Sequence, residues 1–262
     1  MKFPKIISFA NQKGGVGKTT SALQLSFLLS KKDFRVLLVD IDPQANTTSI
    51  FFDVHTIPIE ETIYTVLKEP SVLKDNFIPK QTKWQNLSIL PSTLQLSELE
   101  PSLIGAIDGF FRLQDAFSHI KNHYEFIIID CPPNLGMLTL NALITSDYVI
   151  IPLQAAKFSL EGIKTILQTI ETLNTKFHCH IQVLGALMTM FNERTTIAKT
   201  MLEEMKKYLY LFKTTISHSV IVEESYIMKE PLYTYAPKSK VLSQYQTFTE
   251  EVLNEIQKRE AY

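Results

Sequence analysis

The sequence predicts a doubly wound α/β fold in which helices cover both faces of a mostly parallel sheet. Short β-branched runs alternate along the chain with stretches of helical periodicity. Several predicted strands, such as 35–40, are apolar on both faces, which suits a parallel sheet buried between helices. A glycine-rich turn also joins the first predicted strand directly to the first predicted helix. Together these observations predict a single α/β domain over residues 1–262.

The predicted elements follow in chain order from these patterns. The apolar run at 5–10 ends at the glycine-rich turn, and the amphipathic stretch 18–31 begins there. Later strands are short apolar runs followed by residues of helical spacing, for example Ile197, Met201 and Met205. Strands are predicted at 5–10, 35–40, 87–90, 125–130, 148–152, 182–189 and 213–217, and helices near 18–31, 60–68, 112–122, 137–146, 159–174, 196–209 and 241–258.

The segment 68–86 departs from this alternation. It contains Pro70 and Pro79 among many polar residues, so it is predicted to be an irregular surface excursion. No internal repeat or low-complexity tract interrupts the rest of the chain. Sheets of this kind bind their ligands at the carboxyl ends of the parallel strands. Functional residues are therefore expected directly after the strands.

Composition narrows the classes of protein that this chain can represent. The 26 basic and 27 acidic residues give a formal net charge of -1, so a nucleic-acid-binding role could rest only on a local basic patch. Cys131 and Cys179 lie far apart and form no CxxC pair, which predicts neither a disulfide framework nor a zinc site. The longest apolar runs have the length of strands, and the N-terminus lacks an apolar signal core. We expect a cytosolic protein.

The strongest functional motif is the turn at 11–20, which reads Asn-Gln-Lys-Gly-Gly-Val-Gly-Lys-Thr-Thr. Such a turn points main-chain N–H groups inward, and the following helix adds the positive end of its dipole. Lys18 can reach the outer phosphates of a nucleotide, and the Thr19 hydroxyl can hold Mg²⁺. The strict phosphate-loop pattern has a glycine where this chain has Gln12, and a second lysine, Lys13, opens the glycine run. The motif predicts a polyphosphate site.

Three aspartates follow predicted strands and are expected near this turn. Asp130 ends a strand and is the candidate carboxylate for Mg²⁺, either directly or through water. Asp42 lies just beyond its strand, beside Pro43, where it could orient or deprotonate an attacking water. Asp40 is either a further carboxylate of the metal site or a support for the loop. Any of them alone could instead form a turn or cap a helix, so the phosphate loop in the same chain decides the interpretation.

These motifs resemble those of the ParA/MinD-type ATPases with a deviant Walker A motif, and more narrowly those of the ParA/Soj partition proteins. The resemblance implies a P-loop NTPase fold and spans nearly the full length of the chain in the family's order. The first three of the motifs that carry it are highly specific for the family when they occur together. The residues that carry it are 11–20, 39–46, 129–133 and 135–142, with weaker similarity at 152–154, 160–162, 189–195 and 235–239.

The resemblance implies an ATPase that is switched by its nucleotide. In this family two subunits clamp two ATP molecules face to face, and Lys13 would reach across to the partner's phosphates, much as an arginine finger does. Asp42 matches the family's catalytic aspartate. Together with Lys18, these residues make up the predicted catalytic set. ATP and Mg²⁺ are the implied cofactors, and the implied phosphate-binding residues are Lys13, Gly14, Gly15, Val16, Gly17, Lys18, Thr19 and Thr20.

The family also implies non-specific DNA binding by the ATP dimer and stimulation of hydrolysis by a ParB-like partner. Arg194 matches an expected DNA-contacting arginine, and Lys199 and Lys206 lie on the helix that follows. The segment 215–222 departs from the family, because His218 and Ile221 occupy positions where arginines are usual. Asn192 is a candidate for reading the adenine base, although a turn or cap role suits it equally well.

Three alternatives use the same phosphate loop. A MinD-like membrane ATPase would end in a basic amphipathic helix, but residues 248–262 contain more glutamates than cations. An ATPase that positions a protein cargo would use the same switch without DNA. A metabolic ligase or an iron–sulfur electron carrier is the third alternative, and the separated cysteines disfavour the carrier.

Overall fold

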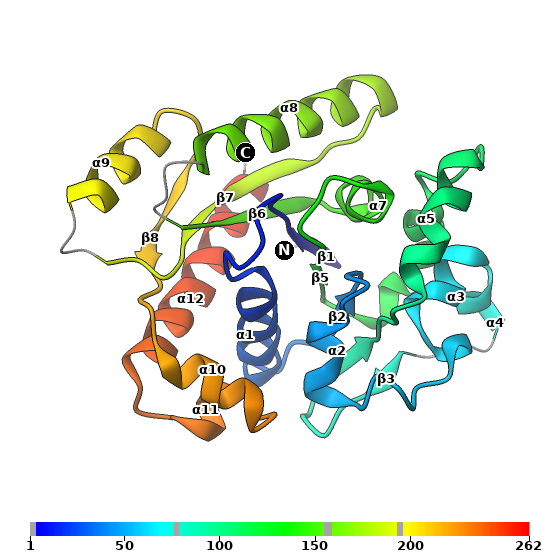
Figure 1. Cartoon of the computed structure of the whole chain (residues 1–262), viewed down its shortest axis with the longest axis horizontal. Helices are drawn as coiled ribbons and strands as arrows, with labels where there is room; N and C mark the ends of the chain where they lie inside the picture. The colour runs from blue at the N-terminus through cyan, green and yellow to red at the C-terminus, as the bar shows by residue number, and fades with distance from the viewer. Residues whose placement is uncertain (1–3, 76–78, 155–158, 193–195, 262) are drawn as a thin grey trace.

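The computed structural model describes residues 4–75, 79–154, 159–192 and 196–261 and contains one eight-stranded sheet (Figure 1). The strand order is β3-β4-β2-β5-β1-β6-β7-β8. All neighbouring strands run parallel except β3 and β4, which pair antiparallel at one edge. The strands are β1 (Lys5–Phe9), β2 (Val36–Asp40), β3 (Lys80–Gln81), β4 (Leu87–Leu90), β5 (Phe126–Asp130), β6 (Tyr148–Leu153), β7 (Gln182–Met188) and β8 (Leu211–Thr215).

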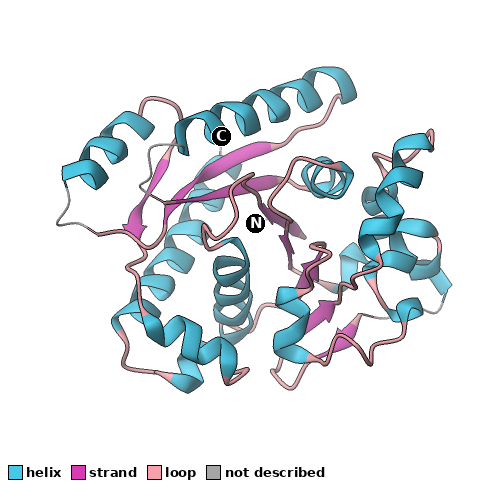
Figure 2. Ribbon diagram, in the orientation of Figure 1, coloured by secondary structure: helices cyan, strands magenta, loops and turns pink. Residues whose placement is uncertain are grey.

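Helices connect the parallel strands and lie on both faces of the sheet (Figure 2). The described helices are α1 (Lys18–Lys31), α2 (Asn46–Phe51), α3 (Ile63–Lys68), α4 (Val72–Asp75), α5 (Leu96–Gly105), α6 (Arg112–Ile120), α7 (Met137–Thr145), α8 (Ser159–Phe177), α9 (Thr196–Met205), α10 (Val220–Ile227), α11 (Leu232–Tyr235) and α12 (Lys240–Glu260), with short 3-10 turns at Ile59–Glu61 and Lys121–His123.

The sheet separates two apolar cores, and successive residues of a strand alternate between them. In β5, Ile127 and Ile129 belong to the core beneath α3 and α5–α8, whereas Phe126 and Ile128 belong to the core beneath α1 and α12. Both sets are fully buried, which explains why this strand is apolar at every position before its aspartate. The predicted doubly wound α/β fold is therefore confirmed.

Strand register brings the functional segments together at one edge of the sheet. Phe9 of β1 and Asp40 of β2 both lie beside Asp130 of β5. Because the three strands are parallel, the turn after β1 and the two terminal aspartates share the carboxyl edge. This arrangement places the glycine-rich turn next to the carboxylates, as the sequence predicted.

Some elements differ from the sequence prediction. The strand expected at 213–217 begins two residues earlier, and the segment 68–86 contains α4 and β3. The apolar face of α12 is buried, with Val252 and Ile256 fully enclosed, so this face packs on the protein itself. None of the described helices combines the length and the apolar character that a membrane span requires.

Candidate nucleotide-binding site

The glycine-rich turn is held open by hydrogen bonds from neighbouring strand ends. Asn11 donates its side-chain amide to Pro152 O (2.7 Å), and its Oδ1 accepts the Lys13 N–H (3.0 Å). On the other side, the Thr189 hydroxyl donates to Val16 O at 2.8 Å. The loop is thus fixed from β1, β6 and β7 before any ligand arrives, so little ordering entropy is needed on binding.

Two glycines give the backbone the turn that leads from the loop into α1. Gly15 (φ 72°) and Gly17 (φ 81°) adopt left-handed backbone that a side chain would disfavour. Gly17 is the N-cap of α1 and provides no side chain to bond the first N–H groups of that helix. The uncapped helix start and its dipole are suited to binding anionic groups.

Lys18 points back over the loop from the first turn of α1. Its Nζ donates to Lys13 O at 3.2 Å, and the side chain is almost completely buried. Burial lowers the pKa of Lys18, and the negative charges of Asp130 and Asp42 oppose this shift. The ammonium therefore lies among carboxylates at the loop, where a polyphosphate would also be neutralised.

Asp40 and Asp130 end adjacent strands, but their oxygens are engaged differently. Asp40 Oδ2 accepts hydrogen bonds from Thr48 N (2.8 Å) and Thr48 Oγ1 (2.7 Å), and its Oδ1 accepts the Asp42 N–H (3.1 Å). Asp130 Oδ2 accepts the Thr47 hydroxyl at 2.7 Å, whereas Asp130 Oδ1 is buried and has no hydrogen-bond partner in the described structure. Asp40 thus acts as support for the loop after β2, and Asp130 has a free oxygen.

That free oxygen fits a magnesium site. Burial raises the pKa of Asp130 to about 6, while the hydroxyls of Thr47 and Thr19 lower it. Mg²⁺ prefers such oxygen ligands and usually shares them with water and substrate phosphates. Across the described residues there is no cluster of three or more His, Cys, Asp or Glu side chains suited to holding a metal alone. Thr19 and Asp130 would therefore hold the ion together with phosphate oxygens.

Asp42 is held at the mouth of the same site. It is only 7% exposed, its Oδ1 accepts the Gln44 N–H at 2.9 Å, and its carbonyl accepts the Ser92 hydroxyl at 2.7 Å. Its charge acts on both Lys18 and Asp130. A carboxylate with fixed main chain and one free oxygen beside the loop is suited to orienting a water.

A small hollow of about 110 Å³ opens beside Gly17 and Thr20, and sequence reasoning missed it. The sequence marked 215–222 as a departure from the family that could alter one edge of the site for the nucleotide base, and the structure places part of this segment beside the loop. The hollow is lined from that segment and its neighbours by Met190, Ser217, His218, Val222, Glu223 and Tyr245.

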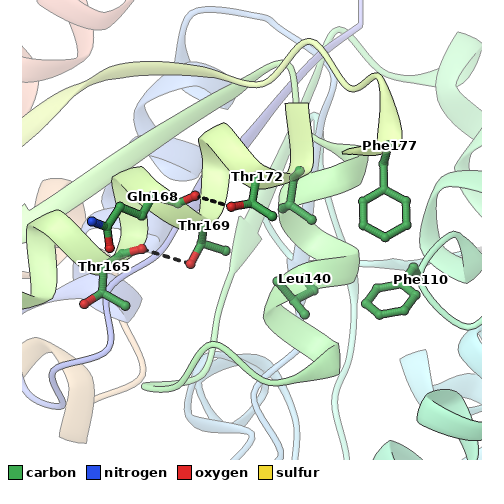
Figure 3. Close-up of a pocket in the computed structure, with 8 residues that line it drawn as sticks. Phe110, Leu140, Thr165, Gln168, Thr169, Thr172 and Phe177 are labelled. Atoms are coloured by element: carbon green, nitrogen blue, oxygen red, sulfur yellow. Dashed lines mark hydrogen bonds between the residues drawn. The ribbon is translucent and has the colours of Figure 1, made fainter. Parts of the chain in front are cut away.

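The larger hollow on the opposite face of the sheet is a different kind of site (Figure 3). It measures about 330 Å³ and lies between α7 and α8, with the rings of Phe110 and Phe177 on one side. Its threonine hydroxyls are already committed, since Thr169 donates to Thr165 O at 2.9 Å and Thr172 to Gln168 O at 2.8 Å. Its described lining residues carry no charged side chain, so they offer nothing that would neutralise a phosphate.

The remaining predicted residues are Asn192 and the candidate DNA contacts Arg194, Lys199 and Lys206. Asn192 is exposed and is not among the residues that line the small hollow, so its base-reading role stays a prediction. Arg194 falls outside the described residues. Lys199 belongs to α9, and Lys206, just after it, is exposed and pairs with Glu203 at 2.6 Å.

Comparison with known proteins identifies the family. Residues 4–183 match the family model described as an AAA domain. The chain is 39% identical to the sporulation initiation inhibitor protein Soj of Bacillus subtilis, over 95% of this chain and 98% of that protein. It is 36% identical to the chromosome partitioning protein ParA of Myxococcus xanthus, over 95% of this chain and 88% of that protein. The chain belongs to the Soj/ParA family of partition ATPases. The predicted family and its ATP-hydrolysing activity are confirmed.

Solved structures with bound nucleotide share this fold. A plasmid partition protein of Borrelia burgdorferi bound to AMPPNP has a TM-score of 0.79 and 30% identity, over 98% of this chain and 99% of that one. A protein of Mycobacterium smegmatis described as cobyrinic acid a,c-diamide synthase, with bound ADP and magnesium, has a TM-score of 0.82 and 29% identity, over 97% and 96%. The prediction of ATP and Mg²⁺ as cofactors is confirmed through these relatives.

Proposed function

We propose that this chain is a Mg²⁺-dependent ATPase that acts as an ATP-switched sandwich dimer in chromosome or plasmid partitioning. The main supporting observation is the geometry at the start of α1. The helix begins at a fixed loop without a side-chain cap, and the buried Lys18 ammonium lies there in the field of Asp42 and Asp130. The ATP dimer would bind DNA without sequence preference, and a ParB-like partner would stimulate hydrolysis. It would work in the cytoplasm on the nucleoid, since a relative is named for chromosome partitioning.

The residues in and around the loop have separate roles in hydrolysis. Lys18 and the N–H groups of the turn bind the outer phosphates, and Asp42 orients the attacking water and receives its proton. Bound Mg²⁺ would draw charge from the phosphate oxygens. Thr19 and Asp130 position that ion, since Asp130 Oδ1 is without another partner in the described chain.

Lys13 is assigned to the phosphates of a second copy of the chain. Its hydrogen bonds in the described structure involve its main chain, through the N–H to Asn11 and the carbonyl to Lys18. The main chain is therefore fixed, while the half-buried side chain lies on the rim of the loop. A cation delivered from the partner would stabilise charge on the transferred phosphoryl group and link hydrolysis to dissociation.

Size-exclusion chromatography with ATP, ADP or no nucleotide tests this proposal. Wild type should shift to a dimer with ATP, and Asp42→Ala should hold the dimer longer because turnover falls, by about 100-fold or more. Lys13→Ala should bind nucleotide yet remain monomeric. Lys176→Ala, at an exposed lysine near the end of α8, is the matched control and should behave as wild type. An ATP-independent elution volume for wild type would overturn the proposal.

A second candidate function is the positioning of a protein or membrane-associated cargo without DNA binding. Two observations favour it. Lys206 and Lys207 are paired with Glu203 and Glu204, which offsets the positive charge after α9. His218 and Ile221 also replace arginines that the family resemblance led us to expect. Attachment to lipid through α12 is disfavoured, because its apolar face is buried in the fold.

A further inference from the structure

A side chain of α5 reaches the start of α7, the helix that follows the loop after Asp130. Oε1 of Glu100 accepts the Leu138 N–H at 3.4 Å. Leu138 lies in the first turn of α7, where main-chain N–H groups have no partner inside the helix. The N-cap of α7 is Gly136, which has no side chain to bind them. Glu100 therefore supplies, from another helix, an acceptor that the N-cap lacks, and the dipole of α7 favours it there.

The glycine at position 136 leaves room for this approach. Its φ of −75° is open to any residue, so the backbone conformation does not require glycine. A Cβ at this position, however, would lie only 2.6 Å from Glu100 Oε1 and 3.0 Å from Asn134 Oδ1. Asn134 Oδ1 also accepts the Gly136 N–H at 2.9 Å. The absence of a side chain thus lets two acceptors meet the start of α7.

The loop 131–136 connects this helix start to the phosphate loop. At its beginning, the Cys131 N–H donates to Phe9 O at 3.3 Å, at the end of β1. Further along, Pro133 Cβ lies 3.9 Å from the place that a Cβ of Gly14 would occupy, which is van der Waals contact. The loop therefore packs on the phosphate loop near Gly14, and its far end is fixed where α7 begins.

The segment that carries Glu100 also contacts the loop after β2. Just before α5, the Ser92 hydroxyl donates to Asp42 O at 2.7 Å, and the Ser92 N–H donates to Thr48 Oγ1 at 2.8 Å. One continuous stretch, from Ser92 to Glu100, thus binds the loop that contains Asp42 and the helix start that ends the loop 131–136. A shift of α5 would displace both loops relative to the phosphate loop.

We propose that Glu100 is a positioning residue that holds the loop 131–136 against the phosphate loop, so that α5 sets the distance between this loop and Asp42. The start of α1 and Lys18 do not take part in this contact, so binding of the phosphates would not depend on it. Turnover would, because a misplacement of about 1 Å can lower a rate by about 100-fold. The inference rests on the proposed function and deepens it, since it names the element that spaces the hydrolytic groups.

Kinetics of Glu100→Ala and Glu100→Gln test this role. Glu100→Ala should lower kcat for ATP by about tenfold and leave KM within about twofold, because positioning is lost while phosphate binding remains. Glu100→Gln should keep most of the wild-type kcat, since its amide oxygen can accept the same N–H. Hydrogen exchange without nucleotide reads the contact directly. Amides at the start of α7 should exchange faster in Glu100→Ala and at the wild-type rate in Glu100→Gln.

Gly136→Ala reaches the same contact from the other side. The added Cβ would displace the Glu100 carboxylate, which is the far end of a flexible side chain, so the fold should be kept. Its kcat should fall as it does in Glu100→Ala. In the double variant the two losses should not add, because both act through one contact.

Glu98→Ala is the matched control. Glu98 is an exposed glutamate in the first turn of α5, and its variant should have the kcat and the exchange of wild type. An unchanged kcat in Glu100→Ala would overturn the inference, as would a Glu100→Gln variant that is equally impaired or losses that add in the double variant. If wild type itself hydrolyses no ATP, the proposed function fails and the role in turnover fails with it. The exchange measurement still tests the contact between Glu100 and α7, so the two failures are distinguishable.

Discussion

At the scale of single residues, Asp130 is one of the buried carboxyls that make the site respond to pH. Burial raises its pKa from 3.8 to about 6, against hydrogen bonds from Thr47 and Thr19. Because the folded pKa is above the unfolded one, the contribution of this group to stability is complete below about pH 4 and is lost as the pH rises through about 6. At neutral pH the nucleotide-free fold therefore contains a buried negative charge that a bound cation would compensate.

Asp130→Asn is expected to raise the free energy of unfolding of the nucleotide-free protein at neutral pH by roughly 1–3 kcal/mol, because the charge of a carboxyl with a raised pKa is removed. Urea titrations at several pH values measure this. The gain should disappear toward about pH 4, where the wild-type carboxyl is protonated as well. The variant should also lose the stabilisation that Mg²⁺ and ATP give to wild type. A variant that is less stable at every pH would contradict the assigned cause.

The sequence predicted where Asp40 and Asp130 lie, but it could not predict how they differ. Both end apolar strands, so their places at the carboxyl edge follow from strand patterning alone. Their separate roles depend on Thr47 and Thr48, which bond one carboxylate each from α2. That short helix was not predicted, because its start at left-handed Ala45 leaves no capping signal in the sequence.

At the scale of elements, a side chain of α12 covers part of the sheet edge at β8. Glu251 of α12 accepts the N–H groups of Lys213 (2.6 Å) and Thr214 (3.0 Å), and the Tyr210 hydroxyl at 3.1 Å. An edge strand with free N–H groups can pair with another chain. The glutamate both anchors α12 to the edge and blocks such pairing.

Glu251→Ala should lower the free energy of unfolding by roughly 1–3 kcal/mol, because main-chain donors lose a charged acceptor. The midpoint of urea unfolding measures the loss, and light scattering during mild heating should show earlier association through the edge. Glu250→Ala is the control. This neighbour is exposed and pairs with Lys32, so its removal should change stability by less than about 0.5 kcal/mol. Equal effects of the two substitutions would argue against the edge role.

The sequence predicted helices and strands correctly where buried apolar residues recur at a regular spacing. It failed where tertiary packing overrides the local conformational preference of the residues. The central strands and α1 were found because both faces of the sheet are covered. Helix α10 begins with β-branched Val220, Ile221 and Val222, which favour strands. This segment is nevertheless helical, because of its packing against α11 and its place beside the hollow. Helix α5 contains Pro101, which local reasoning treats as a break.

At the scale of the whole molecule, net charge does not favour contact with DNA, so binding has to come from a few local cations. Lys206 is already paired with Glu203, and the formal net charge of the chain is -1. The proposed DNA binding therefore depends mainly on the other predicted cations, Arg194 and Lys199, and on the presence of two copies of each in the ATP dimer. Such binding releases counterions and falls steeply with salt.

Mobility-shift titrations with ATP at rising salt measure this contribution. Arg194→Ala should weaken binding and reduce the slope of log affinity against log salt by about 1 for each phosphate that the arginine neutralises. Lys206→Ala should change both quantities less, because its charge is partly neutralised by Glu203. If wild type gives no shift even at low salt, the cargo-positioning function is favoured over DNA binding.

The aromatic cluster around Trp84 gives this protein an intrinsic fluorescent reporter. Trp84 is the one tryptophan of the sequence. Its ring packs edge-on against Phe27 of α1 at 4.9 Å and Phe51 of α2 at 5.4 Å. Helix α1 starts at the phosphate loop, and α2 holds both strand-end carboxylates through its threonines. Intrinsic fluorescence should thus follow relative movement of these two helices in real time, without a label, as nucleotide is loaded and hydrolysed.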